Sequence, residues 1–203
     1  MKGDAYTIAF AGVLGTVCAL LLTGAASFTA PYRASNAQAE EVLNILTALG
    51  VPFDQGASAQ RLVDVFEQNV QERERGDLTV YAYVPEGDQG QPQAFAVRFS
   101  GPGLWGPIEG FLALEPDMRT IRAVTFYHQE ETPGLGGEIS ASWFREQFVG
   151  KSVVDATGEP GITIGGAAGP NSVNAITGAT MTCDKLEAIL DGVLQKLVEE
   201  TNG

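Results

Sequence analysis

The stretch DLTVYAYV, residues 77–84, has the period-two alternation of residue types that a strand shows, and it is rich in β-branched and aromatic residues. This pattern is typical of a strand with one buried face. Three further stretches have the same character: residues 94–99, 111–114 and 120–127. Turns rich in Gly and Pro separate the four stretches, so the sequence predicts consecutive strands in a largely antiparallel sheet.

Apolar residues at helical spacing flank these strands on both sides. Ser35 or Asn36 can cap a first helix that ends at Gly50. Ser58 begins a second helix, whose apolar face includes Val70. A last helix is predicted over residues 184–199, which carry one continuous apolar stripe. Helices around consecutive strands indicate an α+β fold.

Residues 6–30 form an uncharged run of 25 residues before this domain. A helix of that length exceeds the roughly 30 Å of a bilayer's hydrocarbon core. We therefore expect a membrane anchor over residues 1–33 and one extracytoplasmic domain over residues 34–203, with the N-terminus inside. The alternative is a cleaved signal peptide, since residues 37–39 resemble a cleavage site; the run is longer than the about 7–15 apolar residues such peptides use.

Composition excludes several classes of function. The chain has 25 acidic and 12 basic residues, a formal charge of −13, which argues against a nucleic-acid partner. His128 is the only histidine, so we expect neither a metal site nor a Ser/His/Asp catalytic set. The two cysteines, Cys18 and Cys183, would lie in different environments if the apolar run spans a bilayer, and no disulfide is predicted.

The stretch NAITGATMT, residues 174–182, lies just before the last predicted helix. Gly178 and Ala179 leave room for a bulky group near the backbone, and a helix N-terminus attracts negative charge. A phosphate could bind here without a basic side chain. The alternative is structural, because Thr180 or Thr182 could simply cap the helix.

The segment TGAT, residues 177–180, resembles the [Ser/Thr]-Gly-Ala-Thr flavinylation motif of an FMN-binding family. The family includes the C subunit of the Na⁺-translocating NADH:quinone reductase (Nqr) and the G subunit of the related Rnf complex. The resemblance implies that a flavin transferase, using FAD, esterifies Thr180 with FMN. It also implies cofactor contacts from Thr177, Gly178, Ala179 and Thr182. Where the family usually has an aspartate three residues before the motif, this chain has Asn174.

A second match covers residues 126–139, FYHQEETPGLGGEI, which resemble the Glu-Thr-Pro-Gly-Leu-Gly segment of the same family. Its glycines would let the backbone lie close to a flat ring, and Leu135 would cover a ring face. The predicted cofactor contacts are Glu131, Thr132, Gly134, Leu135 and Gly136. Taken alone, the segment could be a plain glycine-rich loop. A third stretch, residues 101–114, is closer to the Nqr member of the family than to the Rnf member.

Further side chains outside the two motifs are weaker candidates for the site. Lys151 either pairs with flavin oxygens or is solvated, and His128 is expected to pack near the flavin loop. Trp143, Phe144 and Phe148 suit the core better than the wall of a flavin site.

The resemblance implies a covalent-FMN electron carrier without independent catalysis, in a bacterial inner-membrane complex. It would pass electrons from an iron–sulfur centre to a second membrane flavin and then to quinone, coupled to Na⁺ movement. Its partners would be the other subunits, the flavin transferase during maturation, and the bilayer. The alternatives are the Rnf G subunit, a non-redox tethered module that binds flavin or phosphate, and a purely structural subunit.

Overall fold

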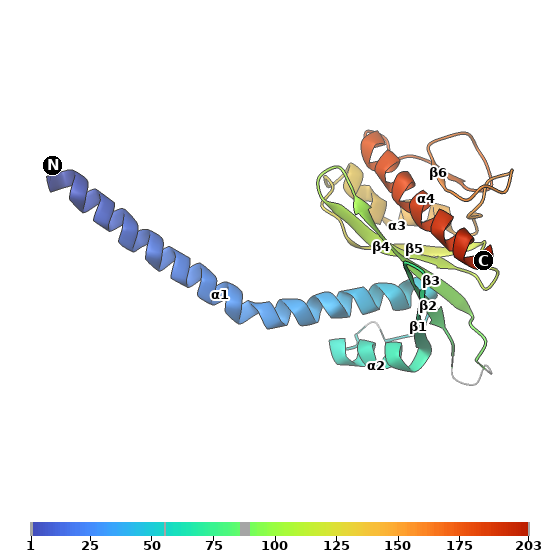
Figure 1. Cartoon of the computed structure of the whole chain (residues 1–203), viewed down its shortest axis with the longest axis horizontal. Coiled ribbons are helices and arrows are strands. Elements are labelled where there is room, and N and C mark those ends of the chain that lie inside the picture. The colour runs from blue at the N-terminus through green and yellow to red at the C-terminus, as the bar shows by residue number, and fades with distance from the viewer. Residues whose placement is uncertain (1, 55, 86–89, 203) are drawn as a thin grey trace. The chain divides into compact units, whose positions relative to one another are not determined.

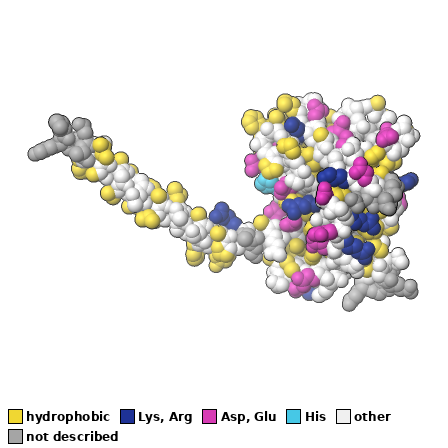
Figure 2. All heavy atoms as spheres, in the orientation of Figure 1, with side chains coloured by type: hydrophobic (Ala, Val, Ile, Leu, Met, Phe, Trp, Pro, Cys, Tyr) yellow, Lys and Arg dark blue, Asp and Glu magenta, His cyan; other side chains and the backbone are white. Residues whose placement is uncertain are grey.

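The computed structural model describes residues 2–54, 56–85 and 90–202, in two compact units, Met1–Ala39 and Glu40–Gly203. Among these residues, α1 (Lys2–Leu49) is the one helix long and apolar enough to cross a bilayer, a property that a signal sequence would share. Figure 2 shows hydrophobic side chains spread along this helix, and Ile8, Leu22 and Phe28 are each 73% exposed. A candidate membrane helix is therefore present, and the predicted boundary after Arg33 stays a prediction.

The predicted break between the anchor and the first domain helix is wrong. The structure has one continuous α-helix through Pro31, so neither Ser35 nor Asn36 begins a new one. A proline inside a helix removes the backbone hydrogen bond to the carbonyl four residues earlier. In the turn before Pro31, two side chains donate hydrogen bonds to backbone carbonyls. The Thr29 hydroxyl donates to the carbonyl of Ala25 at 2.9 Å, and the Arg33 guanidinium to that of Ala26 at 3.2 Å.

The predicted end of this helix at Gly50 is confirmed. Gly50 has a φ of +71°, and its N–H donates to the carbonyl of Thr47. The N–H of Val51 donates to the carbonyl of Leu46 at 2.9 Å. This pair of bonds is a Schellman motif, in which a glycine adopts the left-handed conformation because it has no Cβ.

The largely antiparallel sheet is confirmed. Five strands pair in the order β1-β2-β3-β4-β5, all antiparallel. Their bounds are β1 (Val70–Arg75), β2 (Leu78–Tyr83), β3 (Ala94–Pro102), β4 (Pro107–Leu114) and β5 (Ile121–His128).

Strand β1 has no counterpart among the predicted strands. The second helix, α2 (Ala59–Asn69), begins at the expected cap Ser58 but ends before Val70, which is the first residue of β1. Val70 is buried, whereas Gln71 to Arg75 are exposed. Charged side chains suit an edge strand because they discourage pairing with other chains, but they also hide the alternation by which a strand is recognised.

Each face of the sheet carries its own core. On one face, Val80 and Leu112 pack in a cluster with Leu190 of α4 (Thr180–Asn202). On the other, Tyr81 packs in a cluster that includes Leu46 of α1 and Leu62 of α2. Figure 1 shows α4 and α2 on opposite sides of the strands.

The segment after β5 completes the core on the α4 side. It contains η1 (Gly136–Ser140), α3 (Ser142–Arg145), η2 (Glu146–Phe148) and a parallel pair, β6 (Thr163–Ile164) and β7 (Ser172–Val173). Phe144 and Phe148 are fully buried, which confirms their assignment to the core. The same assignment is wrong for Trp143, which is 47% exposed because its Nε1 donates to Glu138 at 3.0 Å on the surface.

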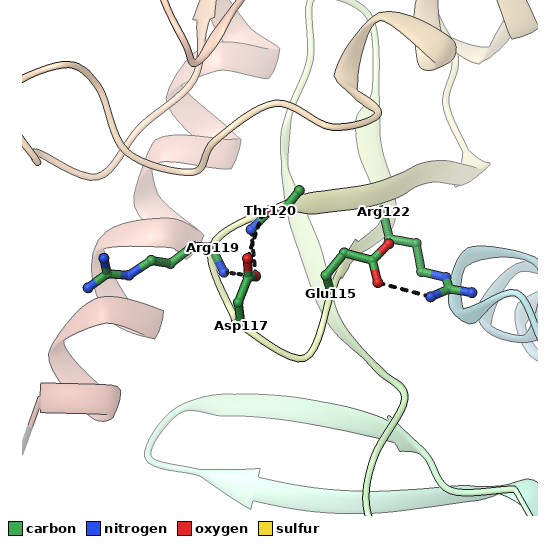
Figure 3. Close-up of polar contacts among 5 residues, drawn as sticks. All are labelled: Glu115, Asp117, Arg119, Thr120 and Arg122. Atoms are coloured by element: carbon green, nitrogen blue, oxygen red, sulfur yellow. Dashed lines mark hydrogen bonds and ion pairs between the residues drawn. The ribbon is translucent and has the colours of Figure 1, made fainter.

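The turn between β4 and β5 is held by its own side chains (Figure 3). Asp117 accepts hydrogen bonds from the N–H groups of Arg119 and Thr120, each at 2.8 Å, and from the Thr120 hydroxyl at 2.7 Å. These bonds, the hydroxyl's foremost, hold the pKa of Asp117 below its ordinary value. Beside the turn, Arg122 pairs with Glu115 at 3.1 Å.

Candidate functional site

Three segments far apart in the sequence meet around one cavity of about 370 Å³. They are the turn between β3 and β4, the loop after β5 and the first turn of α4. The cavity is lined by Leu104, Trp105, Glu131, Thr132, Leu135, Gly136, Gly178, Ala179, Thr180, Met181 and Thr182. Its volume lies within the roughly 300–1,000 Å³ of small-molecule sites.

A glycine turn leads from the core into the cavity. Gly178 has a φ of +81°, and the N–H of Ala179 donates to the carbonyl of Ile176 at 3.0 Å. A Cβ at position 178 would lie 3.2 Å from Cδ2 of Leu135, so the turn also passes close to the opposite loop. Both backbone strain and space therefore favour glycine here.

Helix α4 presents unpaired N–H groups to the cavity. It begins at Thr180, earlier than predicted, and its first backbone bond runs from the N–H of Cys183 to the carbonyl of Ala179 at 3.0 Å. Within the described part of the chain, the N–H groups of Thr180, Met181 and Thr182 have no acceptor. Ala179, which precedes the helix, has no side-chain oxygen to cap it, so this end can bind an anion.

The two threonines at this helix start have different surroundings. Thr182 is 2% exposed, and its hydroxyl donates to Oε2 of Glu131 at 2.7 Å. Thr180 is exposed, and no hydrogen bond to its hydroxyl occurs among residues 2–54, 56–85 and 90–202. Both lie inside α4, so neither occupies the capping position that the alternative interpretation gave them.

Glu131 joins all three segments. Its Oε1 accepts from the N–H of Leu104 at 2.7 Å and from that of Trp105 at 3.2 Å, while Oε2 accepts from Thr182. Sequence reasoning expected this side chain to bond a flavin directly. In the structure its two oxygens already accept three hydrogen bonds from the protein.

The loop after β5 turns at Gly134, whose φ is +75°. The carbonyl of Thr132 accepts from the N–H groups of Leu135 and Gly137 at 3.1 and 3.0 Å. This turn leaves the Leu135 side chain 43% exposed where it lines the cavity.

Most residues predicted from the two motifs line the cavity, and two do not. Thr177 and Gly134 belong to the turns that shape the cavity but are outside its lining. Lys151 lines a different hollow, together with Asn174. Asn174 is held by Gln147, whose Oε1 accepts from both its N–H and its side-chain amide at 2.9 Å. His128 contacts the carboxylate of Glu130 at 3.6 Å.

Sequence reasoning missed three lining residues: Leu104, Trp105 and Met181. All three are exposed, Trp105 by 69%. The signal that could have found them is the pair Leu104-Trp105 between Gly103 and Gly106, because adjacent large apolar side chains in a turn form a patch that often marks a binding site.

The side chains and backbone around the cavity fit a phosphate ester with an apolar body. The N–H groups of α4 suit the anion, and Leu104, Trp105, Leu135 and Met181 provide apolar contact. Cys183 is buried, and burial raises the pKa of its thiol, so it is not an activated nucleophile. Within the described ranges no group of His, Cys, Asp and Glu could hold a metal ion.

Comparison with known proteins places this cavity in a recognised domain. Residues 103–195 match the FMN-binding domain. The C subunit of the Na(+)-translocating NADH-quinone reductase of Neisseria meningitidis is 39% identical over 103 residues, which are 49% of this chain and 40% of that relative. The same subunit of Haemophilus ducreyi is 27% identical over 215 residues, covering 87% of this chain and 84% of the relative. Thus the matched part of the chain spans about two fifths of the Neisseria relative.

Solved structures show the same fold. The C subunit of this reductase from Parabacteroides distasonis superposes with a TM-score of 0.69 at 25% identity, covering 85% of this chain and 96% of that one. NqrC of Shewanella oneidensis has a TM-score of 0.66 at 20% identity, covering 82% and 99%, a likeness of fold alone. These comparisons confirm the resemblance to the Nqr C subunit that the sequence motifs indicated.

Proposed function

We propose that this chain, similar to the C subunit of the Na⁺-translocating NADH:quinone reductase, carries FMN as a phosphoester on Thr180. The observation that supports the proposal is the accessibility of the Thr180 hydroxyl. This exposed hydroxyl has no hydrogen bond among the described residues, and it stands at the start of α4 beside three N–H groups without acceptors. A phosphate on Thr180 would meet the positive end of the helix dipole.

Esterification would join the Thr180 Oγ1 to the phosphorus on the FMN side of FAD, while the pyrophosphate bond breaks, AMP leaves and the hydroxyl proton is lost. An accessible hydroxyl is required, because a flavin transferase must bring FAD to it. Thr182, although two residues away, is buried and bonded to Glu131, so its hydroxyl is not accessible. Thr177 is exposed but lies outside the cavity lining.

The apolar part of the cavity would hold the isoalloxazine ring. Leu135 and Trp105 come from two different loops and both line the cavity with exposed side chains. FMN, when bound, takes up electrons singly or in pairs; the protein's part is to bind, orient and tune it. Covalent attachment would keep FMN from being lost outside the cytoplasm.

In the whole complex, we infer that this protein relays electrons from an iron–sulfur centre to a second membrane flavin and then to quinone, coupled to Na⁺ transport. The apolar part of α1 would anchor it, with the FMN-binding domain on the periplasmic side. The supporting observations are the candidate span in α1 and the similarity to the Nqr C subunit. No catalytic side-chain set of its own is proposed.

Two rival functions make different predictions. The G subunit of an Rnf complex would carry the same ester but would couple to ferredoxin and NAD⁺; the stretch 101–114 and the Neisseria and Haemophilus relatives favour Nqr. A non-redox module that binds flavin or phosphate would use the same cavity without an ester. Intact mass separates the second rival from the proposal.

The test is the intact mass of the denatured full-length chain, expressed in its own host with the flavin transferase. We expect a gain of one FMN less one water, absent in Thr180→Val and kept in the control variant Thr177→Ser, which preserves the [Ser/Thr]-Gly-Ala-Thr pattern. An unmodified wild-type mass, or a gain that persists in Thr180→Val, would refute the proposed attachment.

A further inference from the structure

Glu131 is a buried carboxylate, 4% exposed, that accepts three hydrogen bonds across long sequence separations. Its donors are 27, 26 and 51 residues away: the N–H groups of Leu104 and Trp105 and the hydroxyl of Thr182. The turn that carries Trp105 is thereby tied to the loop after β5 and to α4. A displacement of this carboxylate would move two walls of the cavity at once.

Glycines pack against the carboxylate from both sides. A Cβ at Gly103 would lie 2.5 Å from Oε1, and one at Gly136 would lie 2.8 Å from Oε2 and 2.5 Å from the Thr182 hydroxyl. Real Cβ atoms essentially never approach so closely. Glycine at both positions therefore leaves the space that the carboxylate and the Thr182 hydroxyl occupy.

All three donors to Glu131 are neutral. In the part of the chain that the structure describes, no Lys, Arg or His forms an ion pair with it. A buried carboxylate without a cationic partner is uncommon, because desolvation disfavours the charge. Its negative charge acts on the cavity with little solvent screening.

We propose that Glu131 has two effects on the site: it positions the Trp105 turn against α4, and its charge lowers the reduction potential of the bound flavin. This proposal rests on the proposed function, since it concerns FMN in the same cavity. Adding an electron makes a flavin more negative, and a fixed negative charge in the cavity wall opposes that change.

The neighbouring Glu130 provides a matched control. Its side chain is 58% exposed and lies 3.6 Å from His128, so water screens its charge. Neutralising Glu130 removes the same charge one residue away but outside the buried wall. Glu131→Gln keeps the shape and the acceptor oxygen toward Leu104 and Trp105. The Thr182 hydroxyl can turn to accept from the new amide.

The experiment compares full-length, flavinylated wild type with Glu131→Gln and Glu130→Gln by spectroelectrochemical titration. Glu131→Gln is expected to raise the midpoint potential of the flavin, and Glu130→Gln to raise it much less. An unchanged or lower potential in Glu131→Gln, or an equal rise in both variants, would refute the proposal that the charge of Glu131 lowers the reduction potential of the flavin.

Positioning is tested without relying on flavin, by hydrogen exchange at the N–H groups of Leu104 and Trp105 in the purified full-length chain. In Glu131→Ala, the exchange rate at both N–H groups is expected to rise about tenfold or more. In Glu131→Gln, most of the protection from exchange should remain. Unchanged exchange in a folded Glu131→Ala protein would overturn the positioning effect. If the mass of the wild type shows no covalent FMN, the proposed function is refuted. The hydrogen-exchange comparison still tests the positioning effect of Glu131, because it does not depend on flavin.

Discussion

Two carboxylates in this protein accept hydrogen bonds from the same kinds of donor, one in an exposed turn and one in a buried wall of the cavity. Asp117 and Glu131 each accept from two backbone N–H groups and one threonine hydroxyl. The donors to Asp117 lie two or three residues away in an exposed turn (Figure 3). The donors to Glu131 lie at least 26 residues away, and the carboxylate is buried.

The difference shows what a hydrogen-bonded carboxylate does in each setting. In an exposed turn, water can replace any donor that is lost, so the bonds contribute little beyond the shape of the turn. In a buried wall, water replaces a lost partner less readily, so removing the acceptor costs more than it does in an exposed turn. The Glu131 contacts should therefore determine stability and site geometry together.

The largest expected effect is that of Glu131→Ala. Removing the carboxylate leaves the N–H groups of Leu104 and Trp105 and the Thr182 hydroxyl without their acceptor, and we expect a loss of about 3 kcal/mol in the free energy of unfolding. Urea denaturation of the purified chain measures it. Glu131→Gln, the control, should lose about 1 kcal/mol or less, and equal losses in the two variants would contradict this account.

Thr182→Val should follow, with a loss of about 1–2 kcal/mol. The substitution keeps the shape of the side chain but removes the donor to Glu131 at 2.7 Å. Thr180→Val should change the free energy of unfolding of the unflavinylated chain by less than about 0.5 kcal/mol, because its hydroxyl is exposed. Thermal denaturation of both variants would refute this ranking if Thr180→Val were the less stable.

Asp117→Ala should have a smaller effect, a loss of at most about 1 kcal/mol at neutral pH. Water can take over the N–H groups of Arg119 and Thr120 in this exposed turn. Urea denaturation measures it beside Glu131→Ala. A loss as large as that of Glu131→Ala would show that burial does not distinguish the two carboxylates.

The smallest effect is the acid dependence of the Asp117 turn. Its folded-state pKa lies below the ordinary value of about 3.9, chiefly because of the Thr120 hydroxyl. The folded state therefore favours the charged form, and this contribution is complete above the ordinary pKa and lost as pH falls through the folded pKa. The difference between wild type and Asp117→Ala should shrink between neutral pH and the strongly acid range. A difference that grew on acidification would contradict the direction of the shift.

Local patterns were sufficient for much of the fold. The alternation in residues 77–84 and the glycine at position 50 have local causes, and the structure confirms both the strand and the helix end. Strand β1 was not predicted because its pairing to β2 depends on the neighbouring strand and not on its own charged residues. The continuous α1 was not predicted because a proline followed by possible capping residues is typical of a helix boundary, whereas here the helix continues through Pro31.

For the site, the sequence by itself determined the glycine turn and the threonine at a helix start, since both are local properties of TGAT. Only the tertiary structure decided which threonine is accessible. It alone decided that Trp105 enters the cavity and that Glu131 binds protein donors from three segments. The physical reason is burial, because neither the exposure of a hydroxyl nor the partners of a carboxylate can be set until distant segments pack together.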